Sequence, residues 1–230
     1  MEPWRVTRRR FNSLPGHCPV TWALVLANGV TFLASFLGLS LPLSFHPYTV
    51  TARPWTLLTY ALDGSGSVVS LLLSGYVLWL FGGSLERGWL GRDYLRFLVL
   101  TTAAPAVGLW LAEVWLGRAA GLSGLWVPVA ACAVAWSLLH PGERLLVYFA
   151  IPVDGRWIGI LSAVLVFFSF PFPLGAFALA GCAVAWWYAS GGRYRMRHVF
   201  LVRVPNPLEA FRRWRRKRQF LRLMRRSGLH

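Results

Sequence analysis

Charged side chains are scarce in this chain of 230 residues. Asp, Glu, Lys and Arg together make up 14% of it, and hydrophobic residues make up 56%, whereas soluble domains carry about 25% charged residues. Segments 11–51, 64–85, 97–112, 119–142 and 157–192 contain no charged residue at all. Because a helix needs roughly 17–25 apolar residues to cross a bilayer, this distribution excludes an ordinary soluble domain and predicts an all-α membrane protein.

Cysteine and histidine are also rare. The three cysteines, Cys18, Cys132 and Cys182, are scattered and odd in number, so the sequence contains neither a disulfide framework nor the spacing of a metal site. The five histidines all fall outside the segments that are predicted to cross the membrane. We therefore expect no metal and no cofactor. No predicted span contains a histidine that could take part in a reaction inside the membrane.

Six membrane-spanning helices are predicted, at 21–43, 67–85, 93–115, 122–139, 157–170 and 174–189. The alternative is five, with one long helix over 157–192, but Pro171 and Pro173 interrupt that segment and each would break a helix. Six spans place 22 of the 24 Lys and Arg residues on one side and leave Arg53 and Arg118 on the other. Since basic residues gather on the cytoplasmic side, both termini are predicted to be cytoplasmic.

Three regions follow from this topology: a basic cytoplasmic arm (1–18), a transmembrane domain (19–192) and a basic cytoplasmic tail (193–230). Asn206, Pro207 and Glu209 have the order of a helix start. The charge lies at span ends and in the tail, so anionic lipid headgroups are the expected partner rather than nucleic acid; a solvated tail is the alternative. The residues expected to contact lipid are Arg212, Arg213, Arg215, Arg216, Lys217 and Arg218.

The predicted location is the cell membrane, with several crossings. Arginine outnumbers lysine 23 to 1, which favours a prokaryotic source with GC-rich coding sequence. A transporter or channel is a further class to consider, but it would need an ionisable residue facing the membrane interior. Glu86, Asp93 and Glu113 all lie at the ends of predicted spans, so this class ranks last.

A serine between glycines opens the predicted fourth span, in Gly121-Leu122-Ser123-Gly124. Such a serine is typical of a nucleophile, but its hydroxyl reacts poorly until a neighbouring base removes the proton. The structural alternative is a serine that hydrogen-bonds to a neighbouring backbone on a tightly packed helix. The two interpretations differ in whether a base lies within reach.

Five short motifs follow one another along the chain. These are residues 26–32, residues 54–60, the glycine-to-glutamate segment with Gly82, Gly83 and Glu86, the serine motif from Gly121 to Gly124, and the linker at 141–152. In their order and spacing these motifs resemble those of the rhomboid family of intramembrane serine proteases, and the resemblance covers residues 19–192. The resemblance implies a six-helix core whose short fourth helix is central, with Ser123 in a wet cavity below the outer surface.

The chain departs from the family at the positions that carry catalysis. The resemblance implies a histidine base where Ala178 stands, and a histidine and an asparagine that bind the carbonyl oxygen where Ser70 and Ser74 stand. A further position, usually a histidine in the outer loop, corresponds to Asp63. The base and two of the oxyanion donors are therefore missing from this sequence.

His46 is the one histidine predicted to lie on the same side of the membrane as Ser123. His140 follows Ser123 by 17 residues, which is roughly 25 Å along a helix and too far for a base. The hypothesis is therefore a proteolytically inactive rhomboid-like protein that binds transmembrane segments of client membrane proteins. The alternative is an active serine endopeptidase with Ser123 as nucleophile and His46 as its base.

Overall fold

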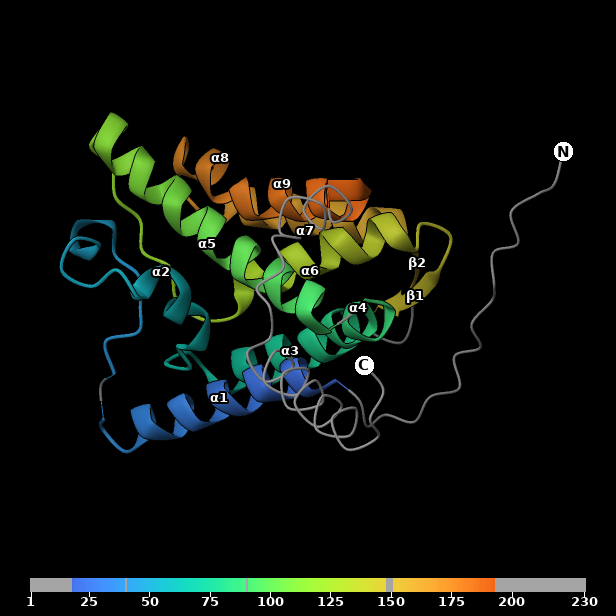
Figure 1. Cartoon of the computed structure of the whole chain (residues 1–230), viewed down its shortest axis with the longest axis horizontal. Helices are drawn as coiled ribbons and strands as arrows, with labels where there is room; N and C mark the ends of the chain where they lie inside the picture. The colour runs from blue at the N-terminus through green and yellow to red at the C-terminus, as the bar shows by residue number, and fades with distance from the viewer. Residues whose placement is uncertain (1–17, 40, 90, 148–150, 193–230) are drawn as a thin grey trace, which may run out of the picture. The chain divides into compact units, whose positions relative to one another are not determined.

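A computed structural model of the chain describes residues 18–39, 41–89, 91–147 and 151–192 (Figure 1). The chain divides into two units, Met1–Gly191 and Gly192–His230. All described residues except Gly192 belong to the first unit. The predicted basic arm, apart from Cys18, and the predicted tail helix, with the residues expected to contact lipid, lie outside the described residues.

Within the described residues, four helical segments are long and apolar enough to cross a membrane: Pro19–Phe36, Val68–Gly88, Gly91–Leu116 and Leu174–Gly191. Two apolar helices, Trp126–Leu139 and Gly155–Phe168, are shorter. This mostly helical structure is consistent with an all-α membrane protein. The elements are α1 (Pro19–Phe36), α3 (Val68–Val77), the π-helical η3 (Leu78–Gly82), α4 (Gly83–Gly88), α5 (Gly91–Leu116), α6 (Trp126–Leu139), α7 (Gly155–Phe168), α8 (Leu174–Ala178), α9 (Ala180–Trp187) and η4 (Tyr188–Gly192).

Helix α6 is the centre of this unit. Every residue from 127 to 137 is buried, and α6 packs against α7, α9, η3 and α5, as its central place in Figure 1 illustrates. Four alanines among these residues let its neighbours approach closely. Gly159 of α7 packs directly against α6, and glycine is required there because a Cβ would overlap the Ser137 hydroxyl. A helix surrounded by protein is apolar on all faces, which explains its sequence.

Two predicted helix boundaries are wrong, each because of one glycine. The first helix ends at Phe36 rather than at 43, because Gly38 has φ +79° and its N–H bonds back to the Ser35 carbonyl, as in a common helix stop. The fourth helix begins at Trp126 rather than at 122, and Gly124 with φ +76° precedes it. Glycine adopts such positive φ values at no steric cost.

The segment after α6 forms a small β-hairpin. Its two strands, β1 (Arg144–Val147) and β2 (Ile151–Asp154), pair antiparallel. Helix α7 then ends at Phe168 and α8 begins at Leu174. The single long helix over 157–192 is therefore wrong, and the two prolines of 171–173 lie in the break.

Short helical turns fill the loop between α1 and α3: η1 (Pro47–Thr49), α2 (Thr56–Thr59) and η2 (Tyr60–Leu62). Tyr60 attaches this loop to α5, because its hydroxyl donates a hydrogen bond to the Thr102 carbonyl at 2.9 Å. Burial raises the pKa of Tyr60 well above its usual value, so the phenol stays a neutral donor.

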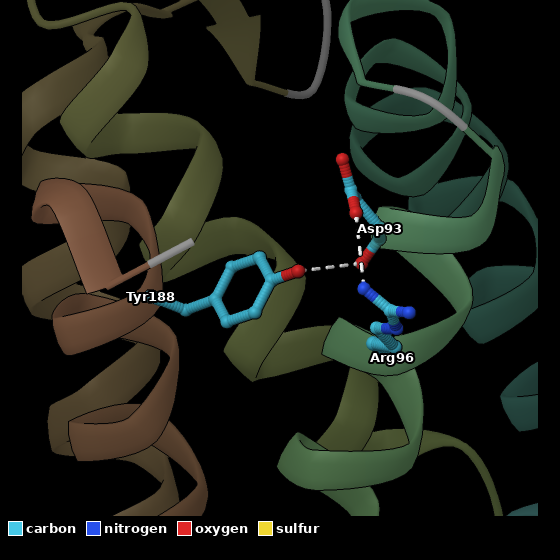
Figure 2. A network of polar contacts seen from close by, with 3 residues as sticks. All are labelled: Asp93, Arg96 and Tyr188. Carbon is cyan, nitrogen blue, oxygen red and sulfur yellow. Dashed lines mark hydrogen bonds and ion pairs between the residues drawn. The ribbon is translucent and has the colours of Figure 1, made fainter. Parts of the chain in front are cut away.

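Tyr188 of η4 links the C-terminal helices to the start of α5. Its hydroxyl donates to the main-chain carbonyl of Asp93 at 2.9 Å, and Arg96 lies 3.7 Å from the Asp93 carboxyl group (Figure 2). The Tyr188 ring also packs on Trp89 and Phe97, with centroids 5.4 and 5.6 Å away. Aromatic pairs at such distances stabilise a fold beyond the burial of their surface, so this cluster holds η4 against the start of α5.

Candidate functional site: a serine-lined pocket beside an apolar groove

A small polar pocket brings together four of the positions that the sequence singled out. Ser70, Ser74, Asp63 and Ser123 all line a cavity of about 110 Å³. Asp63 comes from the loop before α3, the two serines from α3, and Ser123 from the loop before α6. Residues that are far apart in the sequence thus meet at one end of the helices. The other lining residues are Asn28, Gly64, Gly66, Ser67, Leu71, Gly124, Leu125 and Trp126.

Ser123 is held in place by its neighbours' backbone. Leu122 and Phe45 form an isolated β-bridge, with N–H to carbonyl distances of 2.8 and 2.9 Å, and the Gly124 N–H donates to the Tyr60 carbonyl at 2.9 Å. Ser123 itself is exposed and lies before α6, and within the described residues its side chain makes no hydrogen bond. Ser123 thus lies in the loop before α6 and not on the helix itself.

The same β-bridge places His46 next to Gly121. A Cβ on Gly121 would lie 2.9 Å from Nδ1 of His46, so glycine is the residue that fits there. The imidazole stacks on the Tyr48 ring at 5.4 Å between centroids. His46 does not line the pocket that contains Ser123, although it lies beside a residue only two positions away in the sequence.

Ala178 is fully buried in α8 and does not line the pocket. The neighbouring Gly181 is also closely packed, since a Cβ there would lie 3.0 Å from the Thr101 carbonyl oxygen and 3.2 Å from Pro105. Helix α5 fills that space. A histidine at position 178 would therefore overpack the core.

Asn28 is a lining residue that the site prediction missed. It is 2% exposed, and its amide nitrogen donates to the carbonyls of Leu24 and Ala61 at 3.1 and 3.0 Å. Thr31, one turn later, donates to the Leu62 carbonyl at 2.6 Å. The signal was present in the sequence, since polar residues within an apolar span tend to mark functional or packing sites.

The glycine-to-glutamate motif has a structural role at the end of the α3–α4 segment that lies away from the polar pocket. The Glu86 carboxyl oxygens accept hydrogen bonds from the N–H groups of Val20 and Thr21, both at 2.9 Å, and from the Thr21 hydroxyl at 2.7 Å. Glu86 thus caps the first turn of α1, whose N–H groups have no partner within the helix. Gly82 leaves room for the Tyr94 hydroxyl, which a Cβ would approach to 2.5 Å.

A second cavity adjoins the polar pocket. It is an apolar groove of about 580 Å³ between α1 and the α3–η3 segment. The groove and the pocket share Asn28, Leu71 and Leu125, so the two cavities lie next to each other. The remaining residues that line the groove are Trp22, Val25, Leu26, Gly29, Val30, Leu33, Leu72, Gly75, Tyr76 and Trp79.

Neither cavity has the composition of a metal site. In the described part of the chain, no group of three or more His, Cys, Asp or Glu side chains lies close enough together to hold a metal ion. In comparisons with known proteins, no family model matches the chain, and no curated protein matches it.

Proposed function

We propose that the chain is a rhomboid-like protein of the cell membrane that lacks proteolytic activity and binds transmembrane segments of client membrane proteins. In this proposal the four membrane-length helices and the two shorter ones make six spans, both termini are cytoplasmic, and the basic tail lies on anionic headgroups. The observation that carries the proposal is the pocket in which Ser123 meets Ser70, Ser74 and Asp63. These are the positions that the rhomboid resemblance assigns to one active site.

The inactive state follows from the chemistry of that pocket. A base must come within about 3 Å of the serine, directly or through one water. The two histidines of the described residues, His46 and His140, are both absent from the lining, and His140 caps the far end of α6. Each oxyanion donor that is lost costs about 10²–10³ in rate, and serine hydroxyls at 70 and 74 are a weaker donor set than histidine and asparagine.

An active serine endopeptidase is the second candidate, and one observation favours it. Ser123 is exposed, and the β-bridge between Phe45 and Leu122 sets His46 beside Gly121. A serine–histidine pair would require the His46 side chain to leave its stacked position on Tyr48 and turn toward Ser123. The two candidates therefore differ in the reactivity of one hydroxyl.

The Ser123 hydroxyl is expected to be unreactive. Purified protein in detergent or in lipid vesicles should not react with a fluorophosphonate probe, because an unassisted serine is a weak nucleophile. Ser123→Ala should match the unmodified chain in gel fluorescence and in intact mass. Labelling that Ser123→Ala abolishes would contradict the inactive state, and loss of the same labelling in His46→Ala would identify the base and establish the protease.

Client binding is expected at the face that α3 and α7 form beside the buried helix α6. Helices α3 and α7 both pack against α6, and Leu73 of α3 and Leu161 of α7 are more than half exposed. A photo-crosslinking residue at either position should capture membrane proteins through their transmembrane segments, mapped by mass spectrometry. The same residue at Val99 on α5 is the control. Equal capture from all three positions would mean nonspecific contact within the bilayer and would contradict the proposal.

A further inference from the structure

The apolar groove has the dimensions of one lipid chain. Its lining on α1 runs from Trp22 to Leu33, which is roughly 16 Å at 1.5 Å per residue. The groove holds about 580 Å³, and almost all of the residues that line it are apolar. Its length and its lining therefore suit a single hydrocarbon chain.

The side chains that line the polar pocket suit a cation that donates hydrogen bonds. Asp63 supplies its one carboxyl group, and no Lys, Arg or His is among the lining residues that the structure describes. One oxygen of Asp63 accepts the Ser65 N–H at 3.0 Å. The hydroxyl groups of Ser70 and Ser123 make no hydrogen bond within the described residues, so they are available as acceptors. Such a pocket disfavours a phosphate group and suits an ammonium group, which has three donors.

Because groove and pocket share three lining residues, one molecule can occupy both. We infer that this surface binds a phospholipid whose headgroup ends in a primary ammonium, with the ammonium group among Asp63, Ser70 and Ser123 and one acyl chain in the groove between α1 and α3. This site goes beyond client binding, which is assigned to the face between α3 and α7. The phosphate group stays outside the pocket, toward water.

The primary ammonium is distinguished from a quaternary one by its N–H groups. Phosphatidylcholine carries the same charges as phosphatidylethanolamine, but its trimethylammonium group has no N–H to donate. Hydrogen bonds to charged groups are the strong ones. The full chain, purified and freed of lipid in detergent, should therefore retain phosphatidylethanolamine at least about tenfold better than phosphatidylcholine with the same acyl chains.

Native mass spectrometry of the full chain with an equimolar mixture of the two lipids measures this ratio. Asp63→Asn should bring the ratio close to one, whereas Glu113→Gln, a change at a carboxyl group that lines neither cavity, should leave it unchanged. Gly75→Leu should lower retention of both lipids, because its side chain fills the groove; a Cβ at Gly75 meets only Val25, at 3.7 Å. Leu72→Trp is a second variant that fills the groove from its exposed side.

Equal retention of the two lipids would overturn the inference, as would a preference that Asp63→Asn leaves intact. Retention that neither groove-filling variant lowers would also overturn it. A transmembrane peptide that copurifies in place of lipid, and is lost on Gly75→Leu, would assign the groove to a protein segment instead. Client crosslinking at Leu73 and Leu161 is a separate measurement, so the lipid site and client binding can fail independently.

Discussion

Replacing Glu86 with Ala is expected to destabilise the folded protein by about 3 kcal/mol, because each buried donor left unpaired costs about 1–3 kcal/mol. The carboxyl group accepts three hydrogen bonds, from the N–H groups of Val20 and Thr21 and from the Thr21 hydroxyl. Glu86 is 6% exposed, so water cannot easily replace it. The change also removes a negative group from a helix N-terminus, where such groups are stabilising.

The loss should appear as unfolding at a lower fraction of SDS in mixed micelles, followed by tryptophan fluorescence. Thr21→Val removes one of the three hydrogen bonds and should cost about 1 kcal/mol. Glu113→Gln, at a half-buried glutamate of α5, is the matched control and should unfold like the unmodified chain. If Glu86→Ala unfolds at the same SDS fraction as that control, the cap on α1 is not a source of stability.

The helical architecture was largely readable from the distribution of charge. Long segments without charged residues favour apolar surroundings, and the observed helices lie within or close to these segments. The ends were harder to predict, because local backbone geometry sets them. Gly38 and Gly124 adopt positive φ values that end α1 early and delay α6, and a hydropathy pattern does not distinguish such glycines from those inside helices.

The candidate site was predictable only in part. The motif order pointed to Ser70, Ser74, Asp63 and Ser123, and these four line one pocket. The pairing of Phe45 with Leu122 joins segments that are far apart in the sequence, so the position of His46 could not be read from spacing. The donors to Glu86 could not be predicted either, because the sequence around a carboxyl group at a helix end does not indicate which distant N–H groups will donate hydrogen bonds to it.

Replacing Gly108 with Ala is expected to destabilise the protein by about 1–3 kcal/mol, the usual cost of inserting a carbon into a well-packed core. A Cβ at Gly108 of α5 would lie 2.5 Å from the Phe177 carbonyl oxygen of α8 and 3.2 Å from its carbon. Both atoms belong to the main chain, so no rotamer change relieves the contact. Helices α5 and α8 must then separate along a buried interface.

Gly29→Ala is the matched control, since Gly29 also lies in the middle of an apolar helix and a Cβ there would meet no atom within 4 Å. It should keep or raise stability by up to about 1 kcal/mol, because alanine favours helix over glycine. SDS unfolding of the two single variants measures the difference. Equal stability of Gly108→Ala and Gly29→Ala would mean that α5 and α8 are not in close contact at Gly108, and the buried position of Ala178 on α8 would lose its support.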